Sequence, residues 1–443
     1  MKKIKSIRLK SKEERRFKQG HPWVFSNELQ ESPKHLELGE LVELCDAGGA
    51  FLAYGFGNPS SLISFRELTR EKNPKHVDEE SGVTAAFFYD KFRVALQFRN
   101  HWFRKSESFR LVYGEADGLS GLIIDRFVGK EATVYVVQPH ASGMDRNLPL
   151  ITEALKKLSE ELEDPSASII LRRDASSRER EGLTKETPVV QNLKNGAVID
   201  ITNPFQEFRF QVPGSGSSPL SLTTDLISGQ KTGFFFDQLE NIRILEKLLE
   251  RRQLMKPRKN FKILDLCSYI GQWSVHLADT LKRAGAESIQ IMSVDVSQSA
   301  LRLARENIEA AFGKGSGVEA DTLKADVLEP MTTLKSASYD VVIADPPAFI
   351  KSRKSIPQGK QAYANLYQAA IEKTANGGIV VCCSCSQLLS HEDFLEVLGK
   401  ASRRSQRKVR WLTEGSASFD HFSRLEFQEG NYLKSFMGQV SDQ

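Results

Sequence analysis

Four short segments in the second half of the chain carry the side chains best suited to chemistry. Three of them, Ile263–Gly271, Ser293–Ser297 and Asp340–Pro347, contain aliphatic runs followed by acidic residues, as strands do beside a nucleotide-type cofactor such as S-adenosylmethionine. The fourth, Val380–Ser386, places the cysteine Cys385 at the end of a further predicted strand. A thiolate that adds to C6 of a pyrimidine makes C5 nucleophilic. Together the segments predict methylation of a pyrimidine carbon.

The residues expected to hold the cofactor follow the predicted strands. From about residue 235 helices and strands alternate, with strands expected over 262–266, 289–294, 339–344 and 378–383. This alternation predicts a mostly parallel, Rossmann-like α/β sheet with helices on both faces. Ligands of such sheets bind beyond the carboxyl ends of the strands. The predicted cofactor residues at those ends are Asp265, Cys267, Ser268, Gly271, Asp295, Val296, Ser297, Asp326, Val327, Asp345 and Pro346.

Three of these residues have specific expected roles. Gly271 lets the backbone approach the ligand closely, and the helix after it offers free N–H groups. Asp295 is placed to bind the ribose hydroxyls, and Asp326 to bind the adenine amine. A dinucleotide is the alternative ligand, but the loop 265–272 lacks the G-x-G-x-x-G spacing that a pyrophosphate needs. A single acidic residue at a strand end is often only a helix cap. Four acidic residues at corresponding strand ends favour a ligand site.

The motif Asp345-Pro-Pro is the most specific local signal. Two prolines directly after a buried strand cannot continue a hydrogen-bonded ladder and form a rigid turn. Such a turn can present Asp345 and backbone carbonyls to a flat ring that carries an amine. Pro347 and Phe349 are predicted to contact the substrate, with Phe349 stacking on a base. The alternative is a plain strand terminator with Phe349 in the core.

Three cysteines crowd the fourth segment and need separate interpretations. Cys382 and Cys383 lie inside the apolar run 379–383 and are predicted to be packing residues. Cys385 lies beyond this run between two serines, where it can be exposed as a nucleophile if its thiol is ionised. Cys267 is the rival nucleophile, but its position favours packing beside the cofactor.

A further candidate segment, Thr232–Gln238, precedes the sheet. Its three consecutive phenylalanines cannot all be buried on one strand face. Gly233 would free the backbone to cover the cofactor, and Asp237 would cap the following helix, expected over 237–252. Phe235, Asp237 and Gln238 complete the predicted cofactor site.

Upstream of the sheet, the sequence predicts two smaller domains. Residues 1–75 contain short strands and glycine-rich turns typical of a small β-barrel-like domain, and residues 76–200 combine a helix expected over 85–104 with aliphatic strands in an α+β arrangement. The polar stretch 70–82 is expected to link them. Residues 201–443 would form the cofactor-binding domain. Its flexible stretch at 213–219 is expected to be either a linker or a hairpin tip between strands around Phe208 and Leu222.

Composition restricts the class of protein. The chain has 443 residues, 40% hydrophobic and 27% charged, as expected for a globular protein of two or three domains. We find neither a long apolar span nor the apolar core of a signal peptide. Five cysteines are an odd number and lack the paired spacing of a zinc site, so we expect a reducing, cytoplasmic location and no metal.

The net charge of +4 is modest, but three groups of cations suggest a nucleic-acid partner. The alternative for any one group is a merely solvated face. The first group lies within residues 2–18, and the others are Arg172, Arg173, Arg178 and Arg180, and Arg403, Arg404, Arg407, Lys408 and Arg410.

The ordered motifs resemble the family of 23S ribosomal RNA large-subunit methyltransferases that make 5-methylcytosine. Gly20–Ser26, with Trp23, is similar to the family's RNA-binding PUA signature, and Lys231–Gln238 to the stretch before its catalytic domain. The cofactor loop, Asp295, Asp345-Pro-Pro and Ser384-Cys-Ser follow in the family's order, and Tyr432–Phe436 resembles its C-terminal strand. The resemblance covers almost the whole chain.

The resemblance implies S-adenosylmethionine as cofactor, ribosomal RNA as partner and catalysis by Cys385 and Asp345. Cys385 would add to C6 of cytosine, and Asp345 would contact the base. A homodimer and a bacterial source are also implied. Gln272 stands where the family usually has a second glycine, and Ala348 where it has a lysine, so Lys351 or Arg353 is expected to contact RNA instead. The base that removes the C5 proton is unassigned.

Two alternatives remain. Guanine-N7 methyltransferases of ribosomal RNA are similar in layout, but they carry asparagine in place of the cysteine and need no thiol. A non-catalytic RNA-binding relative with a decayed catalytic domain is the other. The acidic strand ends and Cys385 count against it.

Overall fold

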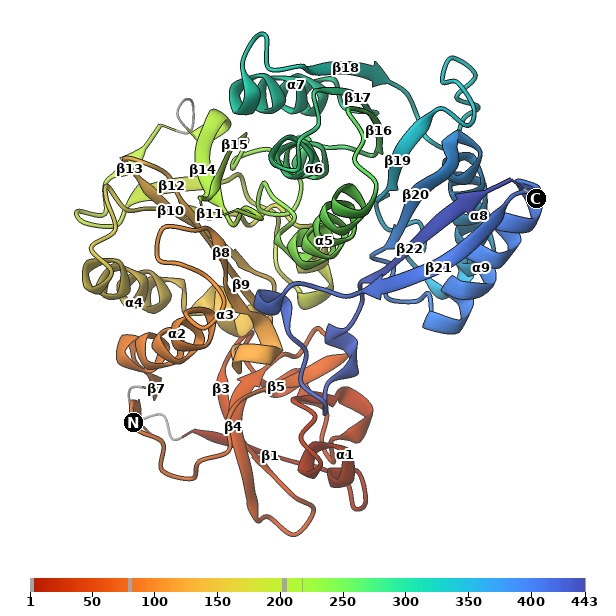
Figure 1. The fold of residues 1–443 in the computed structure, drawn as a ribbon. Helices are drawn as coiled ribbons and strands as arrows, with labels where there is room; N and C mark the ends of the chain where they lie inside the picture. The colour runs from red at the N-terminus through yellow and green to blue at the C-terminus, as the bar shows by residue number, and fades with distance from the viewer. Residues whose placement is uncertain (1–3, 79–81, 201–204, 217, 443) are drawn as a thin grey trace. The chain divides into compact units, whose positions relative to one another are not determined.

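The chain folds into two compact units in the computed structural model (Figure 1). The structure describes residues 4–78, 82–200, 205–216 and 218–442. The N-terminal unit comprises Met1–Gln211, Asp225–Phe236 and Phe419–Gly430, and the C-terminal unit comprises Val212–Thr224, Asp237–Ser418 and Asn431–Gln443. The predicted division into three domains stays a prediction. Parts of the expected linkers, 79–81 and 217, and the cations Lys2 and Lys3 lie outside the described residues.

The N-terminal unit begins with a five-stranded sheet. Its strands, in sheet order, are β1 (Lys5–Arg8), β3 (Leu41–Cys45), β4 (Phe51–Gly57), β5 (Ile63–Thr69) and β2 (Trp23–Phe25). The short helix α1 (Glu14–Lys18) contributes Phe17 to the core of this sheet. In the polar stretch expected as a linker, β6 (Val77–Asp78) pairs with β7 (Gly82–Val83).

A second sheet of the N-terminal unit has six strands. In sheet order these are β13 (Val198–Ile199), β12 (Val189–Asn192), β11 (Ser168–Leu171), β10 (Thr133–Pro139), β9 (Leu122–Val128) and β8 (Phe109–Tyr113). The parallel pair β10–β11 is joined through α3 (Ser142–Arg146) and α4 (Leu148–Glu161), as a parallel connection requires.

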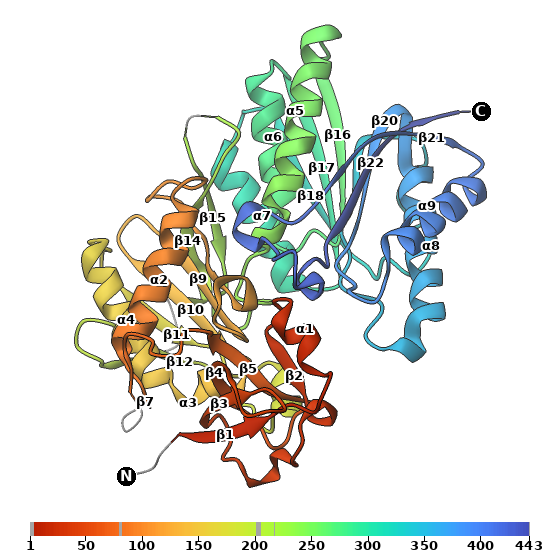
Figure 2. The same ribbon diagram turned by 90° about the horizontal axis from the view of Figure 1, so that it is seen from below.

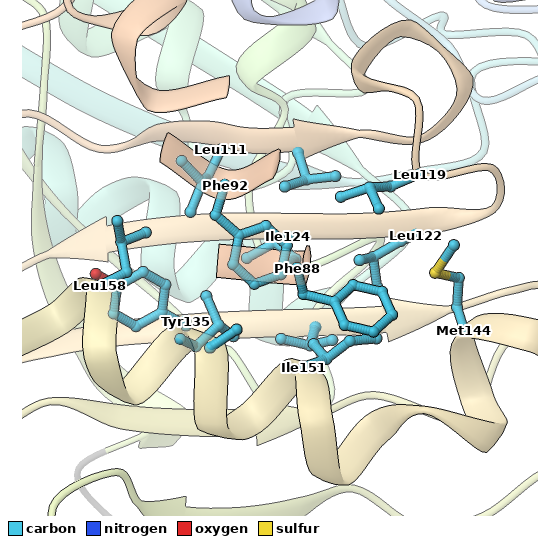
Figure 3. Packing of buried hydrophobic residues seen from close by; sticks show 14 of the residues in the cluster. Phe88, Phe92, Leu111, Leu119, Leu122, Ile124, Tyr135, Met144, Ile151 and Leu158 are labelled. Atoms are coloured by element: carbon cyan, nitrogen blue, oxygen red, sulfur yellow. The ribbon is translucent and has the colours of Figure 1, made fainter. Parts of the chain in front are cut away.

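Helix α2 (Ala85–Arg99) packs with α4 against this sheet. Phe88 and Phe92 are one turn apart, so they lie on one face of the helix and are fully buried. Figure 3 shows these two rings beside Leu111, Ile124 and Tyr135 of the strands, and Ile151 and Leu158 of α4 lie in the same cluster. The helix ends at Arg99, five residues before the expected end.

The C-terminal unit contains the predicted parallel sheet, here with seven strands. In sheet order they are β18 (Val318–Lys324), β17 (Ser288–Asp295), β16 (Asn260–Leu266), β19 (Tyr339–Ala344), β20 (Thr374–Ser384), β22 (Lys434–Ser441) and β21 (Lys408–Gly415). The first five are parallel, and β22 is antiparallel to both of its neighbours. The strand order reverses between β16 and β19, which is where ligands of such sheets bind.

Helices cover both faces of this sheet, as predicted. One face carries α5 (Leu239–Met255), α6 (Gln272–Arg283) and α7 (Gln298–Phe312), and the other carries α8 (Ile356–Lys373) and α9 (His391–Arg404) (Figure 2). The strands β14 (Phe208–Val212) and β15 (Leu220–Thr224) lie where the chain passes between its units. Among the described residues, no helix is long and apolar enough to cross a membrane.

Candidate active site

The loop after β16 forms the centre of the candidate cofactor site. Cys267 and Tyr269 have φ values of 64° and 49°, so the chain turns sharply here. The loop is fixed to the next strand because the Ser268 N–H donates to the Val294 carbonyl at 3.0 Å, and the Tyr269 N–H to Asp295 Oδ2 at 3.0 Å. Asp265 and Asp295 are therefore held at adjacent strand ends, as predicted.

Gly271 is required by the fold independently of any ligand. Its φ of 79° favours glycine, and a Cβ here would lie 3.2 Å from Cα and Cβ of Ala304 in α7. The neighbouring helix α7 therefore approaches the backbone closely at Gly271. Gln272, which departs from the family pattern, begins α6 and is 3% exposed.

The next two strand ends supply further carboxylates. Asp295 is 7% exposed, and its Oδ1 accepts from the Ser297 N–H at 2.9 Å. Ser297 caps α7 through a hydrogen bond from the Ala300 N–H, while Val296 between them is exposed. Asp326 follows β18, is exposed and accepts from the Leu328 N–H at 2.9 Å, whereas Val327 is buried.

Four carboxylates surround Cys267, and this arrangement fits a cationic ligand. Burial raises the pKa of the Cys267 thiol well above its usual value, and the charges of Asp295, Asp345, Asp265 and Asp326 raise it further. S-adenosylmethionine carries a sulfonium and an ammonium group, whereas a dinucleotide carries an anionic pyrophosphate. Among the described residues, Asp265 Oδ1 and Ser268 Oγ are buried without a hydrogen-bond partner, so the loop has unused polar capacity. These observations fit S-adenosylmethionine better than a dinucleotide.

Asp265 differs from the other carboxylates because it is completely buried. Burial raises its pKa from 3.8 to about 7, with smaller contributions from the charges of Asp345 and Asp295. The Ser274 hydroxyl donates to Asp265 Oδ2 at 2.7 Å and opposes this increase. The carboxyl group therefore gains its charge near neutral pH.

Both oxygens of Asp345 accept hydrogen bonds from side chains on other elements. Gln238 Nε2 donates to Oδ1 at 2.7 Å, and the indole Nε1 of Trp273 donates to Oδ2 at 3.1 Å. Gln238 lies in a short helical turn before α5, and Trp273 in the first turn of α6. Asp345 is half-buried. Its orientation is consequently set by residues far apart in the sequence.

The Pro-Pro turn after Asp345 lies beside Cys385. The Cys385 thiol donates to the Pro346 carbonyl at 3.9 Å, which is within hydrogen-bond range for sulfur. Pro346 is buried and Pro347 is exposed. The structure thus brings together the third and fourth sequence segments at the ends of β19 and β20.

Tyr363 of α8 contacts both the loop after β19 and the loop after β20. Its hydroxyl lies 2.8 Å from Ser386 Oγ, and Ser386 Oγ in turn accepts from the Ile350 N–H at 3.2 Å. The ring of Phe349 packs against Tyr363 at 4.7 Å between centroids. Phe349 is half-buried, so this contact uses part of the ring that the sequence assigned to base stacking.

The three clustered cysteines have the expected burial. Cys382 and Cys383 are both fully buried, and burial raises the pKa of Cys382 above its usual range and that of Cys383 well above it. The Cys383 thiol donates to Ser435 Oγ at 3.4 Å. Cys385 is half-buried, so it is the accessible thiol of the three.

The segment before α5 corrects one expectation. Asp237 does not cap the helix, because Gln238 occupies the N-cap position and α5 begins at Leu239. Asp237 instead accepts from the Tyr432 hydroxyl at 2.5 Å. Phe234 and Phe236 are buried, and Phe235 is half-buried, with the Lys231 ammonium 4.5 Å from its ring centroid.

Four further predicted residues lie elsewhere along the chain. Phe235 and Trp23 belong to the N-terminal unit. The Trp23 indole donates to Glu115 at 2.9 Å, so its N–H is engaged within that unit. Lys351 and Arg353 are exposed in the loop that follows the Pro-Pro turn. In the part of the chain that the structure describes, we find no cluster of His, Cys, Asp and Glu suited to a metal ion.

Sequence reasoning missed Trp273, Ser274, Tyr363 and Lys434. Trp273 lies two residues after Gly271, in the first turn of the helix that follows the cofactor loop, and this position was the available signal. Lys434 pairs with Ser384 across the β20–β22 ladder and so lies one residue from Cys385 along that strand. Pairings between distant segments leave no local mark in the sequence.

Comparison with known proteins gives two family matches. A PUA-like domain model matches residues 7–70, and an FtsJ-like methyltransferase model matches residues 244–411, a range that contains the cofactor loop and Cys385. Among curated proteins, ribosomal RNA large subunit methyltransferase I of Escherichia coli O139:H28 is 28% identical, with 95% of each chain covered. The protein of that name from Salmonella gallinarum is 29% identical, with 95% of this chain and 94% of the relative covered.

Solved structures share the fold. A SAM-dependent methyltransferase from Streptococcus mutans has a TM-score of 0.70 and 18% identity, covering 99% of this chain and 100% of its own. A methyltransferase complexed with SAH has the same score and coverage with 17% identity. The predicted Rossmann-like fold, PUA-like domain and S-adenosylmethionine cofactor are confirmed by the family matches and these folds together. The chain therefore combines a PUA-like domain at residues 7–70 with an FtsJ-like methyltransferase domain at residues 244–411.

Proposed function

We propose that this protein methylates C5 of a cytosine in large-subunit ribosomal RNA through a covalent adduct with Cys385. The observation that carries the proposal is the half-buried Cys385 thiol, which donates to the Pro346 carbonyl directly after Asp345. A nucleophile and a fixed acidic side chain thus lie at neighbouring strand ends, where substrates of such sheets bind. The named relatives act on ribosomal RNA of the large subunit, which supports this RNA as the substrate.

The proposed chemistry begins with the thiolate. Cys385 sulfur forms a bond to C6 of cytosine, and the electron pair displaced from the C5–C6 bond makes C5 nucleophilic. Bound S-adenosylmethionine supplies the electrophilic methyl group. Transfer of the methyl group to C5 would leave S-adenosylhomocysteine. A base then takes the C5 proton, the double bond forms again and the C6–S bond breaks, which returns the thiolate. Asp345 would accept a hydrogen bond from the base and hold it in place.

The remaining assignments follow from this function. Asp295 would bind the ribose, Asp326 the adenine amine, and Asp265, Gln238 and the 267–271 loop the rest of the cofactor. Pro347, Phe349, Lys351, Arg353 and the PUA-like domain, including Trp23, would contact RNA. We also propose the division into residues 1–75, 76–200 and 201–443, a cytoplasmic location and a homodimer.

The test is methyl transfer from labelled S-adenosylmethionine to ribosomal RNA stripped of modifications, with the product nucleoside identified by mass spectrometry. Wild type should give 5-methylcytidine, and Cys385→Ala should give none while binding the cofactor with nearly unchanged affinity. The formation of 7-methylguanosine, or transfer by both proteins, would instead favour the guanine-N7 alternative. No cofactor binding by calorimetry would favour a non-catalytic RNA-binding protein.

A further inference from the structure

The hydrogen bonds around Asp345 define a fixed side-chain arrangement at the proposed base-binding position. Each carboxylate oxygen accepts one N–H, from Gln238 at 2.7 Å and from Trp273 at 3.1 Å. The Asp345 backbone N–H also donates to the Leu266 carbonyl at 3.3 Å, which joins the ends of β19 and β16. Main chain and side chain are therefore both held.

The two donors are themselves held in place. Trp273 is 2% exposed in the first turn of α6, and Gln238 is 2% exposed. The Gln238 carbonyl accepts from the side-chain amide of Asn241 at 2.7 Å, and Asn241 is fully buried. Because this contact uses the oxygen end of the Gln238 amide, its nitrogen end faces Asp345. Burial therefore restricts the rotamers of both donors, and the hydrogen bond from Asn241 restricts Gln238 further.

These donors favour one protonation state of Asp345. Hydrogen bonds from two N–H groups stabilise the carboxylate over the neutral acid. An ionised carboxylate only accepts hydrogen bonds. It can accept from the exocyclic amine of cytosine, whereas it would repel the O4 oxygen at the same position in uracil.

We infer that Trp273 and Gln238 are positioning residues that hold Asp345 as a hydrogen-bond acceptor for the exocyclic amine, and so help the enzyme select cytosine. This inference rests on the proposed function. It adds two residues that act through Asp345 and assigns them a role in specificity, which the cofactor-site assignment of Gln238 did not include. Trp273→Phe is the sharpest variant, since it keeps an aromatic ring and removes only the N–H donor and some volume.

The test compares two transcripts of the ribosomal RNA target region. One carries cytosine at the methylated position, and the other carries 2-pyrimidinone, which lacks the exocyclic amine. The single-turnover rate of C6 adduct formation with S-adenosylmethionine present is measured for each on denaturing gels. We expect Trp273→Phe to slow the reaction of cytosine about tenfold, as for the loss of a hydrogen bond to a charged group, and that of 2-pyrimidinone less than about twofold.

Equal losses on both bases would overturn the inference, because a merely structural defect does not depend on the amine. Trp411→Phe, which alters an exposed tryptophan of β21, is the matched control and should change neither rate. If Trp273→Phe does not fold, Gln238→Met is used instead, because it removes the second donor. The rates on cytosine and on 2-pyrimidinone are then compared in the same way. A wild-type protein that forms no adduct with cytosine refutes the proposed function, whereas an active wild type with equal losses refutes only this inference.

Discussion

At the scale of single residues, three cysteines within four positions differ in what their surroundings permit. Cys383 lies inside the sheet, where burial keeps its thiol neutral, and Cys385 lies one residue beyond the end of β20. Of these two thiols, that of Cys385 is the accessible one. The sequence predicted this difference, because the apolar run ends at Cys383 and serines flank Cys385.

Replacement of each cysteine by alanine should separate packing from chemistry. Cys383→Ala should lower the free energy of unfolding by about 1–2 kcal/mol, because it leaves a small cavity in the core, and should retain methyl transfer. Cys385→Ala should abolish transfer with little change in stability. Urea denaturation and the RNA assay on the same preparations check this. If both variants lost activity equally while remaining folded, the assignment of roles would be wrong.

The raised pKa of Asp265 predicts a pH-dependent contribution to stability. Since its pKa is 3.8 unfolded and about 7 folded, the folded state binds more protons between these values. The contribution of Asp265 to the free energy of unfolding is therefore fully present below about pH 4 and is lost as the pH rises through 7. Asp265→Asn should lack this component. The free energy of unfolding of wild type should therefore fall relative to that of Asp265→Asn as the pH rises from 5 to 8.

Urea denaturation at several pH values measures this difference. Asp321→Asn is the control, since Asp321 is an exposed carboxylate on β18, another strand of the same sheet. Parallel stability curves for wild type and Asp265→Asn would show that Asp265 does not titrate in this range.

At the scale of elements, four of the five parallel strands were predicted from the sequence and the region of β22 from the resemblance, whereas β18 and the edge strand β21 were not. The strands β16, β17, β19 and β20 are aliphatic runs in regular alternation with helices, which is the pattern of buried parallel strands. The strand β21 has exposed or half-exposed residues throughout, so it leaves no such run. β8 and α9 were also missed. The candidate site was likewise only partly predictable. Its residues at strand ends could be predicted from the sequence, whereas its contacts between distant segments could not.

The antiparallel pairing of β20 and β22 has a consequence for Cys385, the proposed nucleophile. It places Lys434 opposite Ser384, beside Gln387 and Ser435 in a cavity of about 350 Å³. Burial lowers the pKa of Lys434, and negative charge on Cys385 acts to raise it. The same attraction must favour the thiolate of Cys385 when Lys434 is protonated.

Lys434→Met should therefore slow the alkylation of Cys385. We expect the rate with iodoacetamide at pH 7 to fall about tenfold, because the Cys385 thiolate loses the stabilisation that protonated Lys434 provides. Peptide mapping by mass spectrometry measures the alkylation of Cys385 separately from that of the other cysteines. Lys434→Arg should retain the rate, and Lys408→Met, at the exposed end of β21, should not change it. A pH profile of alkylation that is identical in wild type and Lys434→Met would refute this coupling.

At the scale of the whole molecule, the three groups of cations are not equivalent. In the first group, Lys5 and Arg16 pair with Glu40 and Glu28 at 2.9 Å. In the second, Arg178 is 1% exposed and pairs with Asp145 at 2.8 Å. Arg172 is likewise buried and paired with Asp174. The sequence interpretation of this second group as a phosphate-binding surface was therefore wrong for these two arginines, because burial cannot be read from charge spacing.

The third group remains exposed at Arg403, Arg404, Lys408 and Arg410. Exposed cations that contact phosphates release counterions, so their loss changes the salt dependence of binding. We expect the double variant Arg403→Ala and Arg410→Ala to weaken RNA binding. The slope of log affinity against log salt should fall in magnitude by about 1.5, at roughly 0.7–0.9 for each lost phosphate contact.

Arg178→Ala is the contrasting variant for the same measurement. It breaks a largely buried ion pair, so it should lower the free energy of unfolding by roughly 3 kcal/mol. The salt slope of the folded variant should equal that of wild type, because Arg178 cannot reach a phosphate from inside the N-terminal unit. Filter binding from 50 to 300 mM salt would give both slopes. A reduced slope in Arg178→Ala, with none in the double variant, would mean that RNA is held elsewhere than on the exposed cations of the C-terminal unit.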